Sequence, residues 1–566
     1  MKNMDIQRLV LLFVFSFSLL MLWTEWEKEH RPRPVPVPAT AQQSPAANAK
    51  AVPSGTVPTP STAVPAAPAA PATTVPAGAP APVQKGETVE IRTDLLIASI
   101  DTLGGGLTRL ELTKHKETND LTKDFVLFGA EHQYFAQSGL TGEGGPNHRT
   151  LWQLQPGERT LAEGKDALQV RLSAQGRDGL VVDKTYTFKR NSYVIDVAME
   201  VHNTGRSPVA PHAYFQLTHD GKHAAGGSSL AQSFGAQSFN GFAEYTDDKK
   251  FQKIKYADLD KDKADHVKQA SDGWLAFIEH YFVSAWLPTG KAPRDYVIER
   301  RPDGIYAGRV VVAYPSIAPG AAAKLDASLY AGPQEQNRLK AVAPGFDLVV
   351  DYGWLTIVAW PLFWLLEKYH SLSGNWGVAI ILLTMTLKLA FFPLSAASYK
   401  SMAKMKLVTP RLTKIREMYA NDRARQNQAM MELYKTEKIN PLGGCFPILV
   451  QIPVFIALYW VLLAAIELRH APFILWIHDL SALDPYYVLP TLMMVTMVVQ
   501  TRLNPVPLDP VQAKVMMFMP FVFSIFFFFF PAGLVLYWLC NNILSITQQW
   551  QIQRMFSRDK PAHAKR

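Results

Sequence analysis

Residues 375–393 read NWGVAIILLTMTLKLAFFP and are almost entirely apolar. The length of this stretch is close to the roughly 20 residues that an α-helix needs to cross the hydrocarbon core of a bilayer. Asn375 can begin such a helix and Pro393 can end it. We therefore expect a transmembrane helix at about 374–394, in which Lys388 is the one charged residue that lies well inside a span.

Apolar stretches of similar length occur elsewhere in the chain. They cover residues 5–24, 444–466, 485–501, 514–530 and 533–550. The first has Lys2 and Arg8 at its start, and no small-x-small cleavage site follows it directly. We interpret residues 1–30 as an uncleaved signal anchor, and the sequence thus predicts six transmembrane α-helices.

Residues 351–370 are rich in tryptophan but do not fit a span. Their apolar part is interrupted by Pro361 and is about 14 residues long, shorter than a span needs. Trp360 and Trp364 are of the type that prefers the headgroup zone of a membrane. We expect an interfacial helix that lies flat on the outer surface of the membrane.

Basic residues in the loops predict the orientation of these helices. Residues 398–440 contain ten Lys and Arg residues and four acidic residues, which gives a net charge of +6. In residues 467–484, by contrast, Arg469 is the only Lys or Arg residue. Cytoplasmic loops carry an excess of Lys and Arg, so we place residues 398–440, the short basic tail at 557–566 and both termini in the cytoplasm. Residues of about 25–373 are then periplasmic, as in a Gram-negative inner membrane.

Residues 87–348 have the composition of a soluble domain. Val194–Val201 reads VIDVAMEV and Leu168–Leu172 reads LQVRL, which is the alternation of strands with one buried face. Val310–Tyr314 is a further candidate strand. We expect a large exported all-β domain, built as an antiparallel sandwich.

A linker precedes this domain. Residues 31–86 contain 14 of the chain's 40 prolines, many alanines and no acidic residue. Such a segment cannot bury a core, and proline keeps it extended. We interpret it as a periplasmic spacer.

The functional interpretation depends on Lys388. A lysine inside an apolar helix is costly unless it is paired, hydrated or able to reach the headgroups. It can extend its side chain to the nearby cytoplasmic headgroups, or it can line a water-filled cavity that opens to the cytoplasm. Polar residues in other predicted spans favour the cavity, although hydrogen bonds between helices explain any one of them equally well. These residues are Gln451, Gln500, Ser524, Asn541, Asn542 and Ser545.

A hydrated, positively charged groove suggests a mechanism. It attracts the acidic or polar tail of an incoming protein, and the apolar segment of that protein then moves sideways into lipid. The chain has no P-loop spacing. We therefore expect no nucleotide or other cofactor, no metal and no catalytic residue.

Flexible and aromatic side chains complete the predicted groove. Met494 and Met497 can form an adaptable surface for varied clients, or they can simply fill helix contacts. Tyr537 and Trp538 follow the tight turn at 531–533 and can form a slide for client helices, or an interfacial aromatic belt.

Residues 398–440 predict a helical hairpin. Leu412, Ile415 and Tyr419 recur at helical spacing, 421–422 makes the turn, and a second helix runs over about 423–438. Its basic surface can meet anionic lipids or ribosomal RNA. The residues that we expect to make such contacts are Met402, Lys404, Met405, Lys406, Arg411, Met430 and Met431.

Three long stretches resemble the YidC/Oxa family of membrane insertases, in its Gram-negative form. They are Asn440–Pro447 (NPLGGCFP) with Gln451–Pro453, Leu475–Ser481 (LWIHDLS) with Asp484–Tyr487, and Phe530–Trp538 (FPAGLVLYW). The resemblance is strong over about 350–556, and the anchor, the linker and the exported domain match the Gram-negative form.

This resemblance implies a chaperone and insertase for nascent inner-membrane proteins that works alone or with the Sec translocon and its accessory subunits. It implies a five-helix core around a cytoplasm-facing groove, an exported β-supersandwich, no enzyme activity and no DNA partner. Lys388 stands where the family usually has arginine, Thr384 matches a groove threonine, and Trp538 replaces a frequent second tyrosine. The ribosome is a further implied partner, although the basic tail is short.

Two other classes of protein are alternatives. A secondary transporter or channel often contains inverted repeats, and the predicted spans show none. A sugar-converting enzyme on a membrane anchor needs a paired acid and base within reach of a pocket. No spacing of acidic residues and histidines in the exported region indicates such a pair.

Overall fold

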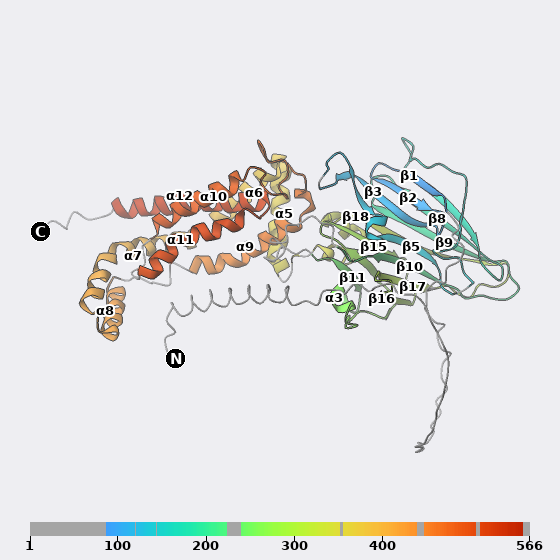
Figure 1. Cartoon of the computed structure of the whole chain (residues 1–566), viewed down its shortest axis with the longest axis horizontal. Coiled ribbons are helices and arrows are strands. Elements are labelled where there is room, and N and C mark those ends of the chain that lie inside the picture. Colours follow the sequence, from blue (N-terminus) through green and yellow to red (C-terminus); the bar gives the residue numbers. More distant parts are fainter. Residues whose placement is uncertain are drawn as a thin grey trace, which may run out of the picture. The chain divides into compact units, whose positions relative to one another are not determined.

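The computed structural model describes residues 86–118, 120–142, 144–222, 239–350, 352, 355–437, 446–504 and 510–558. The predicted signal anchor, nearly all of the predicted linker and the end of the basic tail lie outside these residues. The described chain consists of a β-rich part followed by a helical part (Figure 1).

Two nine-stranded sheets form the β-rich part. The first has the order β1 (Thr88–Arg92), β2 (Leu96–Asp101), β3 (Gly106–Lys116), β5 (Phe135–Leu140), β10 (His212–His219), β17 (Tyr306–Ala313), β16 (Arg294–Arg300) and β13 (Gln269–Ala270), with β4 (Asp124–Phe128) paired to β3. The second has the order β12 (Lys250–Lys255), β11 (Gly241–Thr246), β14 (Trp274–Ile278), β15 (Phe282–Pro288), β18 (Ala322–Pro333), β9 (Val194–Asn203), β8 (Leu180–Lys189), β7 (Ala167–Gln175) and β6 (Gln153–Leu154). Adjacent named strands run antiparallel, for example β8 with β9 and β10 with β17, so the predicted antiparallel all-β domain is confirmed.

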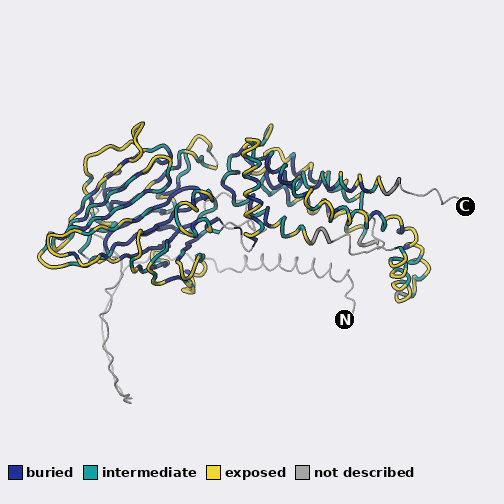
Figure 2. The backbone as a smooth tube through the Cα atoms, turned by 180° about the vertical axis from the view of Figure 1, so that it is seen from behind, coloured by how far each residue is buried: buried dark blue, intermediate teal, exposed yellow. Residues whose placement is uncertain are grey.

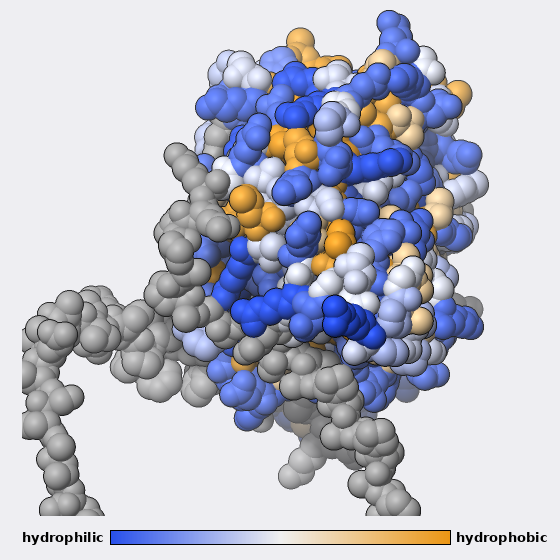
Figure 3. All heavy atoms as spheres, turned by 90° about the vertical axis from the view of Figure 1, so that its right-hand side faces the viewer, coloured by the Kyte–Doolittle hydropathy of each residue, from blue (hydrophilic) through white to orange (hydrophobic). Residues whose placement is uncertain are grey.

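Residue alternation explains strands β7 and β9 of the second sheet. In β9 the residues alternate between half-exposed and buried, and β7 alternates in the same way. One face of each strand therefore packs on the core and the other is more open. Every residue of β15 is buried, which is typical of a strand covered on both faces. In Figure 2 much of the strand region of the β part is dark blue, whereas its outlying loops are mostly yellow. The face of the β part in Figure 3 is predominantly hydrophilic, with small scattered groups of apolar side chains.

A buried lysine connects the two sheets. Lys184 of β8 is fully buried, and its Nζ donates hydrogen bonds to the carbonyl oxygens of Ser138 at 2.8 Å and Gly105 at 3.1 Å. The ammonium group also lies 4.2 Å from the centre of the Trp152 ring. Burial disfavours the charged form and lowers the pKa of Lys184 to about 7.

Among the residues that the structure describes, eight longer helices form the helical part. They are α5 (Thr356–Ser373), α6 (Trp376–Ala390), α7 (Phe392–Met418), α8 (Arg423–Thr436), α9 (Phe446–Ala464), α10 (Val488–Leu503), α11 (Pro510–Phe527) and α12 (Ala532–Arg558). Shorter elements are α3 (Tyr256–Leu259), α4 (Gln336–Val342), and the 3-10 turns η1 (Ala130–His132), η2 (Phe346–Val349) and η5 (Ile466–Leu468). Helices α5, α6, α9, α10, α11 and α12 overlap the ranges that the sequence predicts for the interfacial helix and five spans.

The chain bends sharply after α6. Phe391 separates α6 from α7, and Pro393 lies in the first turn of α7, where a residue without an N–H group is tolerated. No single helix of the described residues is both long and apolar enough to cross a membrane, whereas α6 and α7 meet that requirement together with an angle of 66° between them. The number of six spans therefore stays a prediction.

Helix α11 presents an unusual number of large apolar side chains at the surface. Its exposed residues are Val515, Met517, Phe518, Met519, Phe521, Val522, Phe523 and Ile525. On α12, by contrast, Leu534, Val535 and Leu536 are buried. A contiguous exposed apolar surface of this kind is typical of a membrane or protein contact.

The buried ammonium group predicts a pH-dependent stability of the β part. Lys184 has a pKa of about 7 in the folded state, below its value in an unfolded chain. Between these two values the unfolded state binds more protons, so stability rises with pH, by about 1 kcal/mol per pH unit at pH 8–10. Hydrogen exchange of the β8 amides measures the free energy of unfolding at each pH. The substitution Lys184→Met should remove its increase between pH 8 and pH 10. Parallel pH profiles for the two proteins would contradict the prediction.

Candidate functional site

Lys388 of α6 makes a specific contact with α12. Its Nζ donates a hydrogen bond to Ser545 Oγ at 2.6 Å, and the lysine is only 7% exposed. Ser545 Oγ in turn donates to the carbonyl oxygen of Asn541 at 2.7 Å. Tyr399 of α7 also lies close to Ser545. Within the described chain no acidic side chain forms an ion pair with Lys388, so its charge has a neutral partner.

Further polar side chains join α12 to its other neighbours. Gln451 Nε2 of α9 donates to Asn541 Oδ1 at 3.4 Å, and Asn542 Nδ2 donates to Thr496 Oγ1 of α10 at 2.9 Å. We call this set the polar seam, and it comprises Lys388, Gln451, Thr496, Asn541, Asn542 and Ser545. Because lipid offers no hydrogen bonds, polar groups in such helices must pair with each other or with water.

Thr384 lies one turn before Lys388 and is buried. Its hydroxyl donates to the carbonyl oxygen of Ile380 at 2.7 Å, within the same helix. The Thr384 hydroxyl is therefore satisfied within α6 itself. The residue contributes to the site only by shaping the face of α6 beside Lys388.

The predicted aromatic and methionine residues lie around the polar seam. Tyr537 is fully buried, and Trp538 is half-buried with its ring stacked on Phe455 of α9 at 4.9 Å. Met494 and Met497 are half-buried on α10, where Met497 Sδ lies 3.6 Å from Ser524 Oγ of α11. Tyr537 thus belongs to the packed core, whereas Trp538 lies at its edge.

Sequence reasoning did not single out Thr496, Asn504 or Tyr399. Asn504, just after α10, accepts a hydrogen bond from Gln549 Nε2 of α12 at 3.0 Å. Thr496 is a polar residue inside an apolar run, and that signal could have identified it. Tyr399 offered no such signal, because it lies in a polar stretch.

The predicted hairpin is formed by α7 and α8. Val408 and Leu412 form a small core with Met405 and Met430 packed against it. Arg411 and Glu437 join the two helices through an ion pair of 2.5 Å. Of the other predicted contact residues, Lys406 and Met431 are exposed, and Met402 and Lys404 are half-buried. The hairpin therefore leaves basic and apolar side chains open on its surface.

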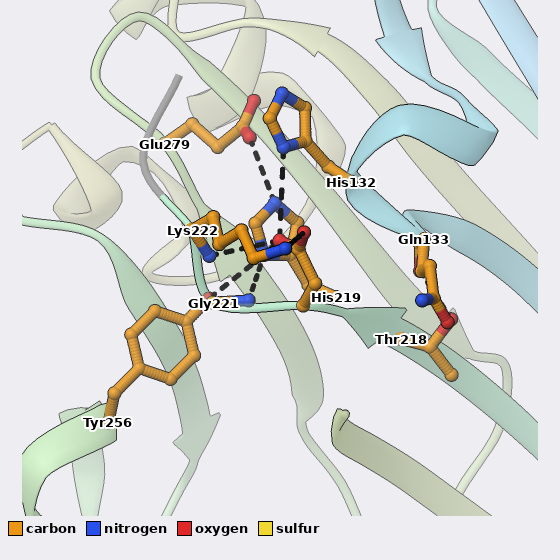
Figure 4. Close-up of polar contacts among 9 residues, drawn as sticks. His132, Gln133, Thr218, His219, Gly221, Lys222, Tyr256 and Glu279 are labelled. Atoms are coloured by element: carbon orange, nitrogen blue, oxygen red, sulfur yellow. Dashed lines mark hydrogen bonds and ion pairs between the residues drawn. The ribbon is translucent and has the colours of Figure 1, made fainter. Parts of the chain in front are cut away.

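The β part contains one cluster that bears on the alternative of a sugar-converting enzyme (Figure 4). The buried ring of His219 has Glu279 Oε1 at 3.6 Å from Nε2, and His132 stacks beside it at 5.9 Å. Asp220 Oδ1 lies 3.8 Å from His132 Nδ1. Figure 4 shows His132 and Glu279 pointing toward His219 from different elements.

Hydrogen bonding in this cluster does not match an acid–base pair. His219 Nδ1 accepts the backbone N–H of Gly221 at 2.8 Å, so Nε2 carries the proton of the neutral ring. The distance from Nε2 to Glu279 exceeds that of a hydrogen bond. The described residues also contain no group of three His, Cys, Asp or Glu side chains that could hold a metal ion. The cluster therefore does not favour the enzyme alternative.

The described chain combines a large antiparallel β domain with a helical part that contains a lysine in its polar seam, which defines a two-part protein with one β and one helical region. The model of the YidC periplasmic domain matches residues 88–365, and that of the 60Kd inner membrane protein matches residues 368–560. These two matches cover the β part and the helical part in turn.

Relatives with the name membrane protein insertase YidC align along most of the chain. The protein from Aromatoleum aromaticum is 53% identical over 506 residues, which is 89% of this chain and 91% of that one. The protein from Dechloromonas aromatica is 54% identical over 517 residues, 91% of this chain and 93% of that one. The chain therefore belongs to the YidC family of membrane protein insertases.

Solved structures give weaker matches. A crystal structure of an active YidC insertase with its first transmembrane domain resolved covers 82% of this chain and 92% of that chain, with 18% identity and a TM-score of 0.38. A galactose mutarotase related enzyme from Lactobacillus acidophilus covers 43% of this chain and 97% of that chain, with 8% identity and a TM-score of 0.30. The family assignment rests on the sequence matches.

The contact between Asn542 and Thr496 predicts a measurable coupling between α12 and α10. In the double-mutant cycle of Asn542→Ala and Thr496→Val we expect a coupling of about 0.6–1.7 kcal/mol, the range of hydrogen bonds between membrane helices. Equilibrium unfolding of the purified protein in mixed micelles measures the four free energies of unfolding. A coupling near zero would show that the two side chains do not stabilise each other.

Proposed function

We propose that this protein inserts proteins into the inner membrane through a hydrated, positively charged groove that begins at Lys388. The observation that carries the proposal is the buried contact of Lys388 with a neutral hydroxyl, beside polar side chains from α9, α10 and α12. The names of its relatives support the same activity.

In this mechanism Lys388 attracts the acidic or polar tail of a client. Because Ser545 is neutral, it does not cancel the lysine charge, and that charge acts on a carboxylate across a medium of low dielectric. Asn541 and Gln451 offer hydrogen bonds to a tail that enters partly hydrated. Trp538, Met494 and Met497 then provide an adaptable apolar surface along which the client helix moves into lipid.

We propose that the chain lies in the inner membrane with both termini and the α7–α8 hairpin in the cytoplasm. The +6 charge of residues 398–440 supports this orientation. Helix α5 then lies at the periplasmic surface, and its exposed Ile357, Trp360 and Trp364 suit the headgroup zone. The β part is periplasmic in the same arrangement.

We propose four kinds of partner for this protein: client proteins, the Sec translocon, anionic lipids and the ribosome. Nascent inner-membrane proteins are the clients, which the protein also helps to fold, alone or together with the Sec translocon and its accessory subunits. The exposed basic residues of the hairpin, among them Lys406 and Arg411, suit anionic lipids and the ribosome. Insertion by this mechanism uses no nucleotide or other cofactor.

The groove predicts a difference between two substitutions at Lys388. In liposomes that contain only this protein, Lys388→Glu should slow insertion of a single-span client with a short acidic tail by about tenfold, or roughly 1.4 kcal/mol. Lys388→Arg keeps the charge and should remain close to the parent protein. Protease protection of the tail measures insertion.

The control is the same client with a neutral tail, which both variants should insert at similar rates. Equal insertion of the acidic client by the Glu and Arg variants would contradict the electrostatic groove.

A further inference from the structure

The loop that joins α9 to α10, residues 465–487, contacts the first residues of both α6 and α12. Asn375 Nδ2, at the start of α6, donates hydrogen bonds to the carbonyl oxygens of Phe473 at 2.9 Å and Pro472 at 3.3 Å. At the start of α12, the N–H groups of Ala532 and Gly533 donate to the 465–487 loop. Their acceptors are the carbonyl oxygens of Ala482 at 2.7 Å and Leu480 at 2.8 Å. The loop therefore satisfies N–H groups that a helix leaves without partners.

Two glycines allow this close approach. A Cβ atom on Gly377 of α6 would lie 2.0 Å from the ring of Phe473. A Cβ atom on Gly533 of α12 would lie 3.0 Å from the carbonyl oxygen of Leu480 and 3.5 Å from Ile380 of α6. The loop, α6 and α12 thus meet at one point without room for further side-chain atoms.

The loop has its own internal hydrogen bonds. Asp484 is 2% exposed, and its carboxylate accepts hydrogen bonds from Trp476 Nε1 at 3.0 Å and from the N–H of Leu489 at 2.7 Å. Ile477 and Leu480 are buried beneath it. An element held in this way can fix the positions of the helices that it contacts.

Two residues farther along the same helices carry the candidate site: Lys388 near the end of α6 and Ser545 near the middle of α12. Lys388 lies 13 residues after Asn375, and Ser545 lies 13 residues after Ala532. At about 1.5 Å per residue, each contact residue is roughly 20 Å along its helix from the loop. The equal spacing brings the lysine and the serine to the same depth, where they form their hydrogen bond.

We infer that the 465–487 loop positions α6 against α12 and thereby holds Lys388 on Ser545, with Asn375 as a positioning residue for the insertase site. This inference rests on the proposed function of Lys388. A helix that slides by one residue moves its side chains by about 1.5 Å, which is enough to break a hydrogen bond at the far end.

Asn375→Asp separates positioning from local helix stability. Asn375 Oδ1 accepts the N–H of Val378 at 3.1 Å and so caps α6, and an aspartate retains this cap. The aspartate loses the Nδ2 donor and places a carboxylate oxygen against the carbonyl oxygens of Phe473 and Pro472. We expect insertion of the acidic-tail client to slow by about threefold to tenfold, as for the loss of a hydrogen bond.

A second readout reports the helix positions directly. In a background with Cys445→Ala and Cys540→Ala, the pair Lys388→Cys and Ser545→Cys is joined by a short thiol-reactive cross-linker. Adding Asn375→Asp should lower the cross-linking rate at least about threefold, whereas a merely local loss of stability would not change the spacing at this distance. Gly533→Ala tests the contact of the 465–487 loop with α12. It should also lower the cross-linking rate.

Ser373→Ala is the matched control. Ser373 Oγ lies 2.8 Å from the carbonyl oxygen of Tyr369, to which it donates, and it accepts the N–H of Asn375 at 3.4 Å. It makes no hydrogen bond with the 465–487 loop among those described. It should leave both readouts close to the parent protein.

Unchanged cross-linking in both Asn375→Asp and Gly533→Ala would overturn the positioning role of the loop, whatever the insertion rates. Full insertion of the acidic-tail client by Lys388→Glu would instead overturn the proposed function. The two failures are therefore distinguishable.

Discussion

An ammonium group among apolar helices needs hydrogen-bond acceptors, and this requirement organises the helical part of the protein. Lys388 meets it at Ser545, a residue of another helix. The Ser545 hydroxyl in turn donates a hydrogen bond to the backbone carbonyl oxygen of Asn541. A carboxylate partner would have neutralised the lysine, whereas a hydroxyl partner does not cancel its charge, as the proposed function requires.

Helix α12 is the common partner in this arrangement. It contacts α6 through Ser545, α9 through Asn541 and α10 through Asn542. At its other end it begins on the 465–487 loop, where α6 also begins. The two regions of α12 differ in character. Its start makes close backbone contacts with the loop at Gly533, whereas Asn541, Asn542 and Ser545 make side-chain hydrogen bonds.

The β part handles a buried lysine differently. Lys184 is enclosed by two carbonyl oxygens and the Trp152 ring, and burial lowers its pKa to about 7. Its ammonium group is fully buried and contacts residues of the other sheet, so the lysine serves to join the two sheets. The same residue type therefore has a structural role in one part of the chain and a proposed functional role in the other.

The sequence by itself indicated an all-β domain and the approximate helix ranges, and it singled out Lys388 as an isolated charge, because alternation, apolar length and an isolated charge are local properties of the chain. Only the tertiary structure decided that Lys388 meets Ser545, that Tyr537 is buried, and that His219 and Glu279 approach each other. These are contacts between residues far apart in sequence. A sequence pattern specifies which face of an element is apolar, but the partner that this face meets depends on how all the elements pack together.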